Sequence, residues 1–162
     1  LYPRAVSLAG LSKTLSAPGL RIGWLAAQDE ALLARCAALK DYTTICSSAP
    51  GELLALMVLQ ASQRIMAANR TLIESNAALW DAFVRDHADR LTWSLPRGGS
   101  VAFPQYRGRG DADAFCRAAR EEADVLLAPG SLWGYAEHFR VGLGRRSAPE
   151  AIDALDSWLK RS

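Results

Sequence analysis

The sequence contains no apolar run long enough to cross a bilayer: its longest, residues 53–59, has seven residues, whereas a transmembrane helix needs about 20. It also lacks a strong charge of either sign, because 19 basic and 17 acidic residues leave a net charge of +2. Nucleic-acid binding usually requires a pronounced basic patch. With 50% hydrophobic and 22% charged residues, the 162-residue chain can bury a core. We therefore expect a soluble globular protein that binds neither nucleic acid nor a membrane.

Cysteine is scarce, and Cys36, Cys46 and Cys116 form no C-x-x-C pair and no pattern with histidine at zinc-binding spacing. An odd number of scattered cysteines does not indicate a disulfide framework, so we expect reduced thiols, a cytoplasmic location and no metal site. Lysine is rare too, with three copies beside sixteen arginines. A lysine in an unusual setting is therefore a candidate functional residue.

Hydrophobic periodicity predicts a mixed α/β organisation in the first part of the chain. We expect two strands joined by a loop rich in Ser, Gly and Pro, then a helix capped by Asp29, and finally one long helix: residues 4–9, 20–27, 31–40 and 53–86. In the second strand, three apolar residues alternate with Arg21 and Gly23, so Arg21 should face away from the core. The long helix is expected to join two lobes, with a boundary near residue 70.

The second part of the chain also reads as α/β. We expect a hairpin, a helix that begins at an Asp113 cap, two further strands and a last helix opened by a Ser-Ala-Pro-Glu capping box: hairpin strands 91–95 and 101–104, strands 125–128 and 139–143, and the box at 147–150. In residues 139–143, Phe, Val and Leu can pack inward, which leaves Arg140 on an open face.

One lysine lies in a loop of hydroxyls and glycines, in the run Gly-Leu-Ser-Lys at residues 10–13. A connecting loop has no structural need for a lysine, whereas imine formation with a carbonyl is the usual covalent role of this residue. The hydroxyl of Ser12 can donate to phosphate oxygens, and the planar fork of Arg21 suits phosphate better than a point charge does. Lys13 is thus a candidate nucleophile beside a candidate phosphate site.

This segment resembles the pyridoxal-phosphate attachment motif of class I/II aminotransferases of fold type I, which reads Ser/Gly-x-Ser-Lys, a short gap, and Gly-x-Arg-x-Gly. Residues 10–23 meet each specified position, although many members have Ser where Gly10 stands. The resemblance implies pyridoxal 5'-phosphate as cofactor, Lys13 as the catalytic Schiff-base lysine and proton carrier, and Ser12 and Arg21 as cofactor-binding residues.

Three further segments resemble parts of the same family. Pro-Arg-Gly-Gly at 96–99 is similar to the hairpin beside the substrate, residues 125–134 are similar to a pocket-lining loop, and Phe-Arg-Val-Gly at 139–142 is similar to the strand whose arginine binds the substrate carboxylate. The resemblance therefore implies that Arg140 binds substrate. Residues 42–48 fall where relatives place cross-dimer phosphate contacts, which implies a homodimer, but a plain polar loop is an equal alternative.

Full-length members carry an earlier half with an Asp for the pyridine nitrogen, a stacking aromatic and an Asn, and none of these motifs precedes Lys13. Residue 1 is not Met, and the first residues do not resemble a signal peptide. The resemblance thus implies the C-terminal part of the fold. Residues 1–70 would end the large-domain sheet and begin a long linking helix, and residues 71–162 would form a small α/β domain with antiparallel strands.

The implied parent activity is transfer of an amino group between an amino acid and a 2-oxo acid, with the 162-residue chain itself inactive. Enzymes of the same fold that eliminate, replace or cyclise share the lysine motif, so a lyase or a cyclising synthase is an alternative. Residues 40–46 are similar to cyclising amino-acid synthases of antibiotic pathways. A different class of alternative is a non-catalytic folding or dimerisation module.

Overall fold

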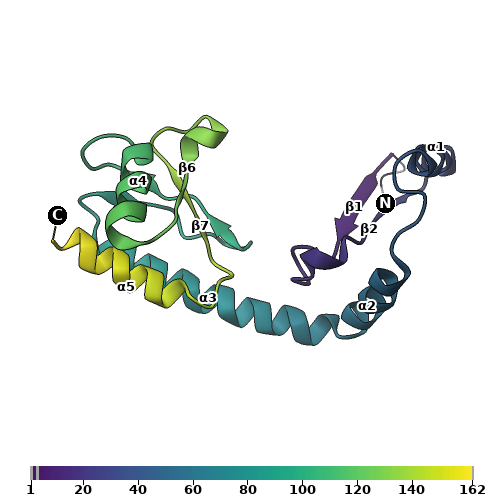
Figure 1. Ribbon diagram of the computed structural model, residues 1–162, viewed down its shortest axis with the longest axis horizontal. Helices are drawn as coiled ribbons and strands as arrows, with labels where there is room; N and C mark the ends of the chain where they lie inside the picture. Colours follow the sequence, from purple (N-terminus) through teal and green to yellow (C-terminus); the bar gives the residue numbers. More distant parts are fainter. Residues whose placement is uncertain (1, 3, 162) are drawn as a thin grey trace. The chain divides into compact units, whose positions relative to one another are not determined.

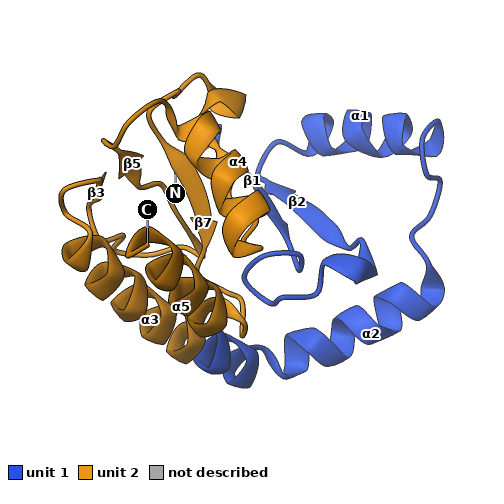
Figure 2. Ribbon diagram, turned by 60° about the vertical axis from the view of Figure 1, so that its left-hand side comes forward, with its two compact units in different colours: residues 1–69 blue, residues 70–162 orange. Residues whose placement is uncertain are grey.

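The computed structural model describes residue 2 and residues 4–161, and it divides the chain into two compact units, residues 1–69 and 70–162 (Figure 2). The boundary expected near residue 70 lies next to this division. The division falls inside a helix, α3 (Ser62–Asp86), so the backbone passes from one unit to the other without a loop. Within the described residues, no helix combines the length and the apolar character that a membrane span needs.

The strands of unit 1 form an antiparallel pair, β1 (Val6–Gly10) and β2 (Gly23–Ala27) (Figure 1). Gly10 lies opposite Gly23 at the end where the lysine loop begins and ends. A Cβ at Gly23 would lie 2.8 Å from the backbone oxygen of Ala9, so the two strands approach too closely there for a side chain. The two glycines thus bring together the two ends of the loop that contains Lys13.

Three helices lie in unit 1 or begin there: α1 (Glu30–Asp41), α2 (Ala49–Gln60) and the start of α3. The side chain of Asp29 accepts a hydrogen bond from the backbone of Leu32 at 2.9 Å, which confirms the predicted cap. The single long helix expected over residues 53–86 is wrong, because the backbone leaves helical geometry at Ala61, where ψ is 5°. Two helices replace it.

The described residues of unit 2 form five short antiparallel strands in two small sheets. β3 (Leu91–Thr92) pairs with β5 (Gln105–Tyr106), while β7 (Phe139–Gly142) lies between β4 (Val101–Ala102) and β6 (Ala128–Pro129). The predicted hairpin between residues 91–95 and 101–104 is therefore wrong. Pro96 and Pro104 have no N–H to give to a ladder, and the strands on either side of the 96–99 turn take partners elsewhere.

Two helices complete unit 2, α4 (Ala112–Ala123) and α5 (Ala148–Leu159), and α5 runs along α3 (Figures 1 and 2). The predicted cap of α4 is wrong by two residues: Asp111 accepts from the backbone of Ala114 at 2.8 Å, whereas Asp113 accepts from the hydroxyl of Ser131. Pro149 does stand in the first turn of α5, but Ser147 makes no cap hydrogen bond, so no capping box forms.

The main core lies in unit 2, between its sheets and helices. Phe139, Leu143 and Leu155 are each 1% exposed. Asn76 on α3 is also buried and donates to the backbone oxygens of Leu143 at 2.8 Å and Arg145 at 2.7 Å. Buried amides need hydrogen-bond partners, and the partners of Asn76 are the backbone oxygens just after β7. The two bonds therefore connect the end of β7 to α3.

Candidate cofactor and substrate sites

Two buried leucines anchor the lysine loop of unit 1, which connects β1 and β2. Leu11 is fully buried and Leu15 is 8% exposed, while Lys13 between them is exposed. The backbone of Ala17 donates to the oxygen of Leu11 at 3.0 Å, and that of Ser16 donates to the oxygen of Lys13 at 3.1 Å. The alternation of anchor and exposed residue presents the Lys13 amine on a fixed turn rather than on a free chain.

The loop has an uncompensated positive charge. No acidic residue occurs before Asp29, and neither Lys13 nor Arg21 forms an ion pair with any described residue. The other two lysines are engaged: Lys40 donates to the backbone oxygen of Ile45 and Lys160 to Asp156, each at 2.7 Å. Of the three lysines, Lys13 is the one whose amine is left available within the described residues.

Arg21 does not lie on a strand, which corrects the parity argument made from the sequence. It follows the short 3₁₀ helix η1 (Pro18–Leu20), has a φ of 55°, and precedes β2. Its Nη1 donates to the backbone oxygen of Pro18 at 2.7 Å. Ser16 has a positive φ of 52° in the same loop. Left-handed backbone at two non-glycine residues is costly and concentrates at functional sites.

A guanidinium has five N–H donors, so the bond to Pro18 orients Arg21 and leaves donors for an anion. Ser12 is half-buried in the same loop, and its hydroxyl can donate to the same kind of ligand. A free amine, a guanidinium and a hydroxyl without a competing carboxylate suit a phosphorylated aldehyde. The donors present therefore fit pyridoxal phosphate.

In unit 2, β7 presents Arg140 as the sequence predicts. Phe139 and Val141 are buried at 1% and 4% exposure, and Arg140 and Gly142 between them are exposed. Arg140 has no ion pair and no hydrogen bond from its side chain among the described residues. The guanidinium lies over the ring of Trp133, with Cζ 4.7 Å from the ring centroid. An exposed guanidinium without a carboxylate partner can bind one from a ligand.

Trp133 and the aromatic residues that pack with it are functional candidates that the sequence reasoning missed as individual residues. Phe103 has Trp133 and Tyr135 edge-on and His138 stacked at 5.0 Å with an interplanar angle of 10°. Of these residues, only Trp133 lies in the segment 125–134 that the sequence predicts as a pocket-lining loop. The periodicity of a strand or an α-helix could not reveal the cluster, because Phe103 lies between β4 and β5 and the other members lie in residues 133–138, outside the strands and α-helices.

A comparison with protein-family models identifies the family. The model of the aminotransferase class I and II family matches residues 2–155. The chain belongs to this family.

Two curated relatives of this class I/II aminotransferase chain illustrate the range of named activities. Capreomycidine synthase from Streptomyces vinaceus is 27% identical over 139 residues, which cover 86% of the chain and 36% of the relative. Aspartate aminotransferase from Thermotoga maritima is 27% identical over 162 residues, covering 99% of the chain and 39% of the relative. The chain thus spans less than two fifths of the length of either relative.

Structural comparison confirms the fold class. A PLP-dependent aminotransferase from Streptococcus suis superposes with a TM-score of 0.89 at 28% identity, over 99% of this chain and 43% of that one. The family member described here therefore has the α/β fold of the C-terminal portion of such enzymes, with antiparallel strands in unit 2. The cofactor expected from the sequence is the one in that protein's name.

Two groups in unit 2 with shifted pKa values, Cys116 and Asp156, have structural surroundings. Burial, reinforced by Asp113, raises the pKa of Cys116 to about 12, so its thiol stays protonated and unreactive. Hydrogen bonds from Lys160 and His87 lower the pKa of Asp156. The described cysteines, histidines and acidic residues form no group that could hold a metal ion.

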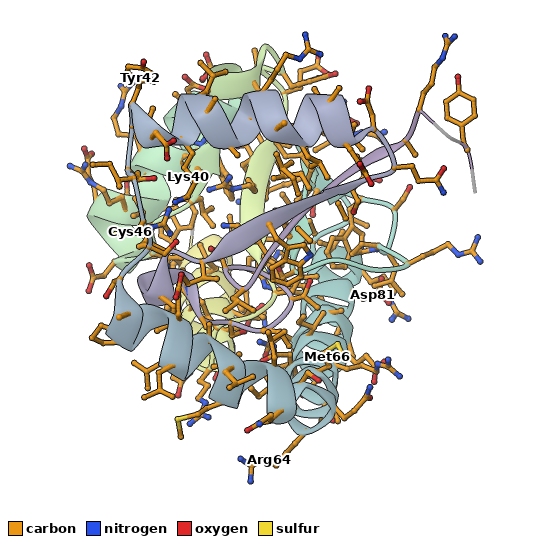
Figure 3. All side chains as sticks on the ribbon, turned by 90° about the vertical axis from the view of Figure 1, so that its right-hand side faces the viewer. Lys40, Tyr42, Cys46, Arg64, Met66 and Asp81 are labelled. Carbon is orange, nitrogen blue, oxygen red and sulfur yellow. The ribbon has the colours of Figure 1, made fainter. Side chains whose placement is uncertain are left out.

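Residues 42–48, expected to reach across a dimer, connect α1 and α2 (Figure 3). Tyr42 is 91% exposed and Ile45 71% exposed. Ile45 has a φ of 57° and is held by the Lys40 amine. The cross-dimer role stays a prediction.

Proposed function

We propose that this chain is the C-terminal portion of a pyridoxal-phosphate-dependent aminotransferase that moves an amino group between an amino acid and a 2-oxo acid. The observation that carries the proposal is the anchored loop of unit 1, in which the Lys13 amine makes no hydrogen bond or ion pair with any described residue and Arg21 follows in an acid-free segment. Membership of the family supports it.

Each residue then has a defined task. Lys13 supplies the amine that attaches the cofactor and afterwards accepts and returns the α-proton of the substrate at its Nζ atom. Ser12 and Arg21 donate to the phosphate. Arg140 binds the α-carboxylate through paired N–H donors. When bound, pyridoxal phosphate supplies the electron sink that weakens the bonds at the α-carbon.

The attachment is tested by borohydride reduction of the full-length protein loaded with the cofactor, followed by peptide mapping. We expect the pyridoxyl group on Lys13. Lys40 and Lys160 are internal controls, since their amines are engaged in hydrogen bonds. Label on either of them, with Lys13 unmodified, would contradict the proposal.

A lyase or cyclising synthase on the same cofactor is the second candidate, and similarity to capreomycidine synthase favours it. Product analysis with a labelled amino acid distinguishes the reactions. Transfer gives a labelled 2-oxo acid and aminates an added 2-oxo acid, whereas elimination or cyclisation proceeds without any amino-group acceptor.

The alternative of a non-catalytic module concerns the 162-residue chain by itself. We propose that the 162-residue chain alone does not catalyse transamination. We also propose that the full-length protein is a homodimer and is located in the cytoplasm. Steady transamination by the isolated chain would contradict the first statement. Sedimentation of the full-length protein as a monomer would contradict the second.

A further inference from the structure

The only ring or ion-pair partner of Arg140 among the described residues is the indole of Trp133, with the guanidinium carbon 4.7 Å from the ring centroid. The contact joins an exposed arginine on β7 to a residue of the short 3₁₀ helix η2 (Gly130–Trp133). A cation–π contact at an exposed site is favourable, so it favours one orientation of a guanidinium that has no ion pair.

The segment that carries Trp133 is held tightly. The backbone of Gly130 donates to the oxygen of His138 at 2.6 Å, and that of Tyr135 donates to Gly130 at 3.0 Å. A Cβ at Gly130 would lie 2.4 Å from each of two backbone oxygens, those of Tyr135 and His138. These contacts close residues 130–138 into a compact loop that tolerates no side chain at its base.

Side-chain contacts hold the same segment from outside the loop. The hydroxyl of Ser131 donates to Asp113 on α4 at 2.7 Å. Phe103 meets the indole of Trp133 edge-on, at a centroid distance of 6.2 Å and an angle of 84°. Trp133 is nevertheless 45% exposed, so the indole is supported by Phe103 and still partly open to solvent.

We propose that Trp133 is the positioning residue of Arg140: the indole covers one face of the guanidinium and directs the in-plane N–H edges toward the substrate carboxylate. This inference rests on the proposed function. A cation–π contact uses the face of the guanidinium, whereas a carboxylate binds at its edge through two parallel hydrogen bonds. Both contacts can therefore exist at once. The cation–π contact already restricts rotation of the Arg140 side chain, so carboxylate binding loses less conformational entropy.

The carboxylate is common to the amino acid and the 2-oxo acid, so loss of the indole should affect both substrates alike. In the full-length protein loaded with pyridoxal phosphate, we expect Trp133→Leu to raise KM for both substrates about threefold to thirtyfold, the range of a cation–π contact. kcat should change less than twofold, and the cofactor's absorption spectrum should be unchanged. Trp133→Phe keeps a ring and should recover part of the loss.

Tyr135→Leu is the matched control. Tyr135 lies in the same loop and contacts Phe103 and His138, but no contact with Arg140 is among its ring interactions. If packing of the aromatic cluster is what matters, Tyr135→Leu and Trp133→Leu will raise KM equally, and the inference is overturned. An unchanged KM in Trp133→Leu overturns it as well.

A measurement independent of turnover uses fluorine NMR of the full-length protein labelled with 5-fluorotryptophan. The chain has five tryptophans, and Trp133→Phe assigns the resonance of Trp133. We expect Arg140→Gln to shift this resonance, and titration with pyruvate to shift it in the wild type but not in Arg140→Gln. A Trp133 resonance insensitive to Arg140→Gln overturns the inference.

The two proposals fail in different ways. If Arg140→Gln shifts the Trp133 resonance but neither pyruvate nor an amino acid does, the contact exists and the carboxylate role of Arg140 is wrong. If Arg140→Ala raises KM and Trp133→Leu does not, the proposed function stands and the positioning role of Trp133 is wrong.

Discussion

Units 1 and 2 differ in how they hold their functional residues. In unit 2, seventeen buried residues form one core around β7, and Arg140 projects from a strand fixed on its other face. In unit 1, the cluster among the described residues has three buried members, Leu11, Leu15 and Ala55, and two of them lie in the lysine loop itself. The proposed binding arginine is thus positioned by a large core, whereas the proposed nucleophile is positioned by a small local cluster.

Exposed apolar side chains underline the difference. Leu8 on β1 is 81% exposed and Leu53 on α2 is 63% exposed, whereas Phe139 on β7 and Leu155 on α5 are each 1% exposed. Substitutions in unit 1 should therefore change chemistry with little effect on folding, whereas core substitutions in unit 2 should mainly change stability. Four measurements on the full-length protein sharpen or break this comparison.

The largest effect is expected for Lys13→Ala. Loss of the residue proposed to move the proton should lower turnover about 10²- to 10⁴-fold, while the free energy of unfolding should change by at most about 0.5 kcal/mol because Lys13 is exposed. Single-turnover kinetics and denaturant unfolding measure the two quantities. Lys160→Ala is the control in unit 2, and an equal loss of turnover there would break the comparison.

Next are two identical substitutions in helices of the two units. Leu155→Ala in α5 removes a side chain that is 1% exposed and should destabilise the fold by about 2–5 kcal/mol. Leu53→Ala in α2, at 63% exposure, should change stability by at most about 0.5 kcal/mol. Urea denaturation measures both. A large effect at Leu53 would show that its surface is covered in the full-length protein.

Arg140→Ala should have a smaller effect, confined to binding. Hydrogen bonds to charged groups are worth about 1.5–3 kcal/mol, so amino-acid affinity should fall roughly ten- to a hundredfold. The bound cofactor's spectrum and the stability of unit 2 should hardly change, because the side chain is exposed. Arg140→Lys should recover only part of the affinity. Unchanged affinity in Arg140→Ala would assign this arginine to the solvated surface.

The smallest effect concerns Asp156, whose pKa is lowered by hydrogen bonds from Lys160 and His87. A carboxyl with a lowered pKa in the folded state stabilises the fold above its unfolded pKa of about 3.8, and this contribution disappears as pH falls through the folded value. Asp156→Asn should therefore be slightly less stable than the wild type at pH 6 and equal to it at pH 2. A difference that grows on acidification would contradict this.

The alternation of apolar and polar residues predicted β7 and the exposure of Arg140, because a strand with one buried face must alternate. The residue types of the lysine loop predicted the candidate nucleophile, and Asp29 predicted the start of α1. Each of these predictions depends only on residues that are close together in the sequence.

The sequence did not predict features that depend on distant partners. β3 and β4 have two residues each, too few for a pattern, and tertiary contacts choose their partners. The left-handed backbone of Arg21 leaves no trace in residue type, since arginine rarely adopts it. The aromatic cluster of Phe103, Trp133, Tyr135 and His138 joins two segments that are distant in the sequence, which periodicity does not describe.

The two hydrogen bonds from Asn76 to the backbone after β7 also have a mechanical consequence. Asn76 sits in α3, and its amide grips the oxygens of Leu143 and Arg145 just beyond the strand that carries Arg140. The two bonds therefore tie the second half of α3 to the chain that follows β7. We expect a displacement of this part of the helix to be passed on to the strand that carries Arg140.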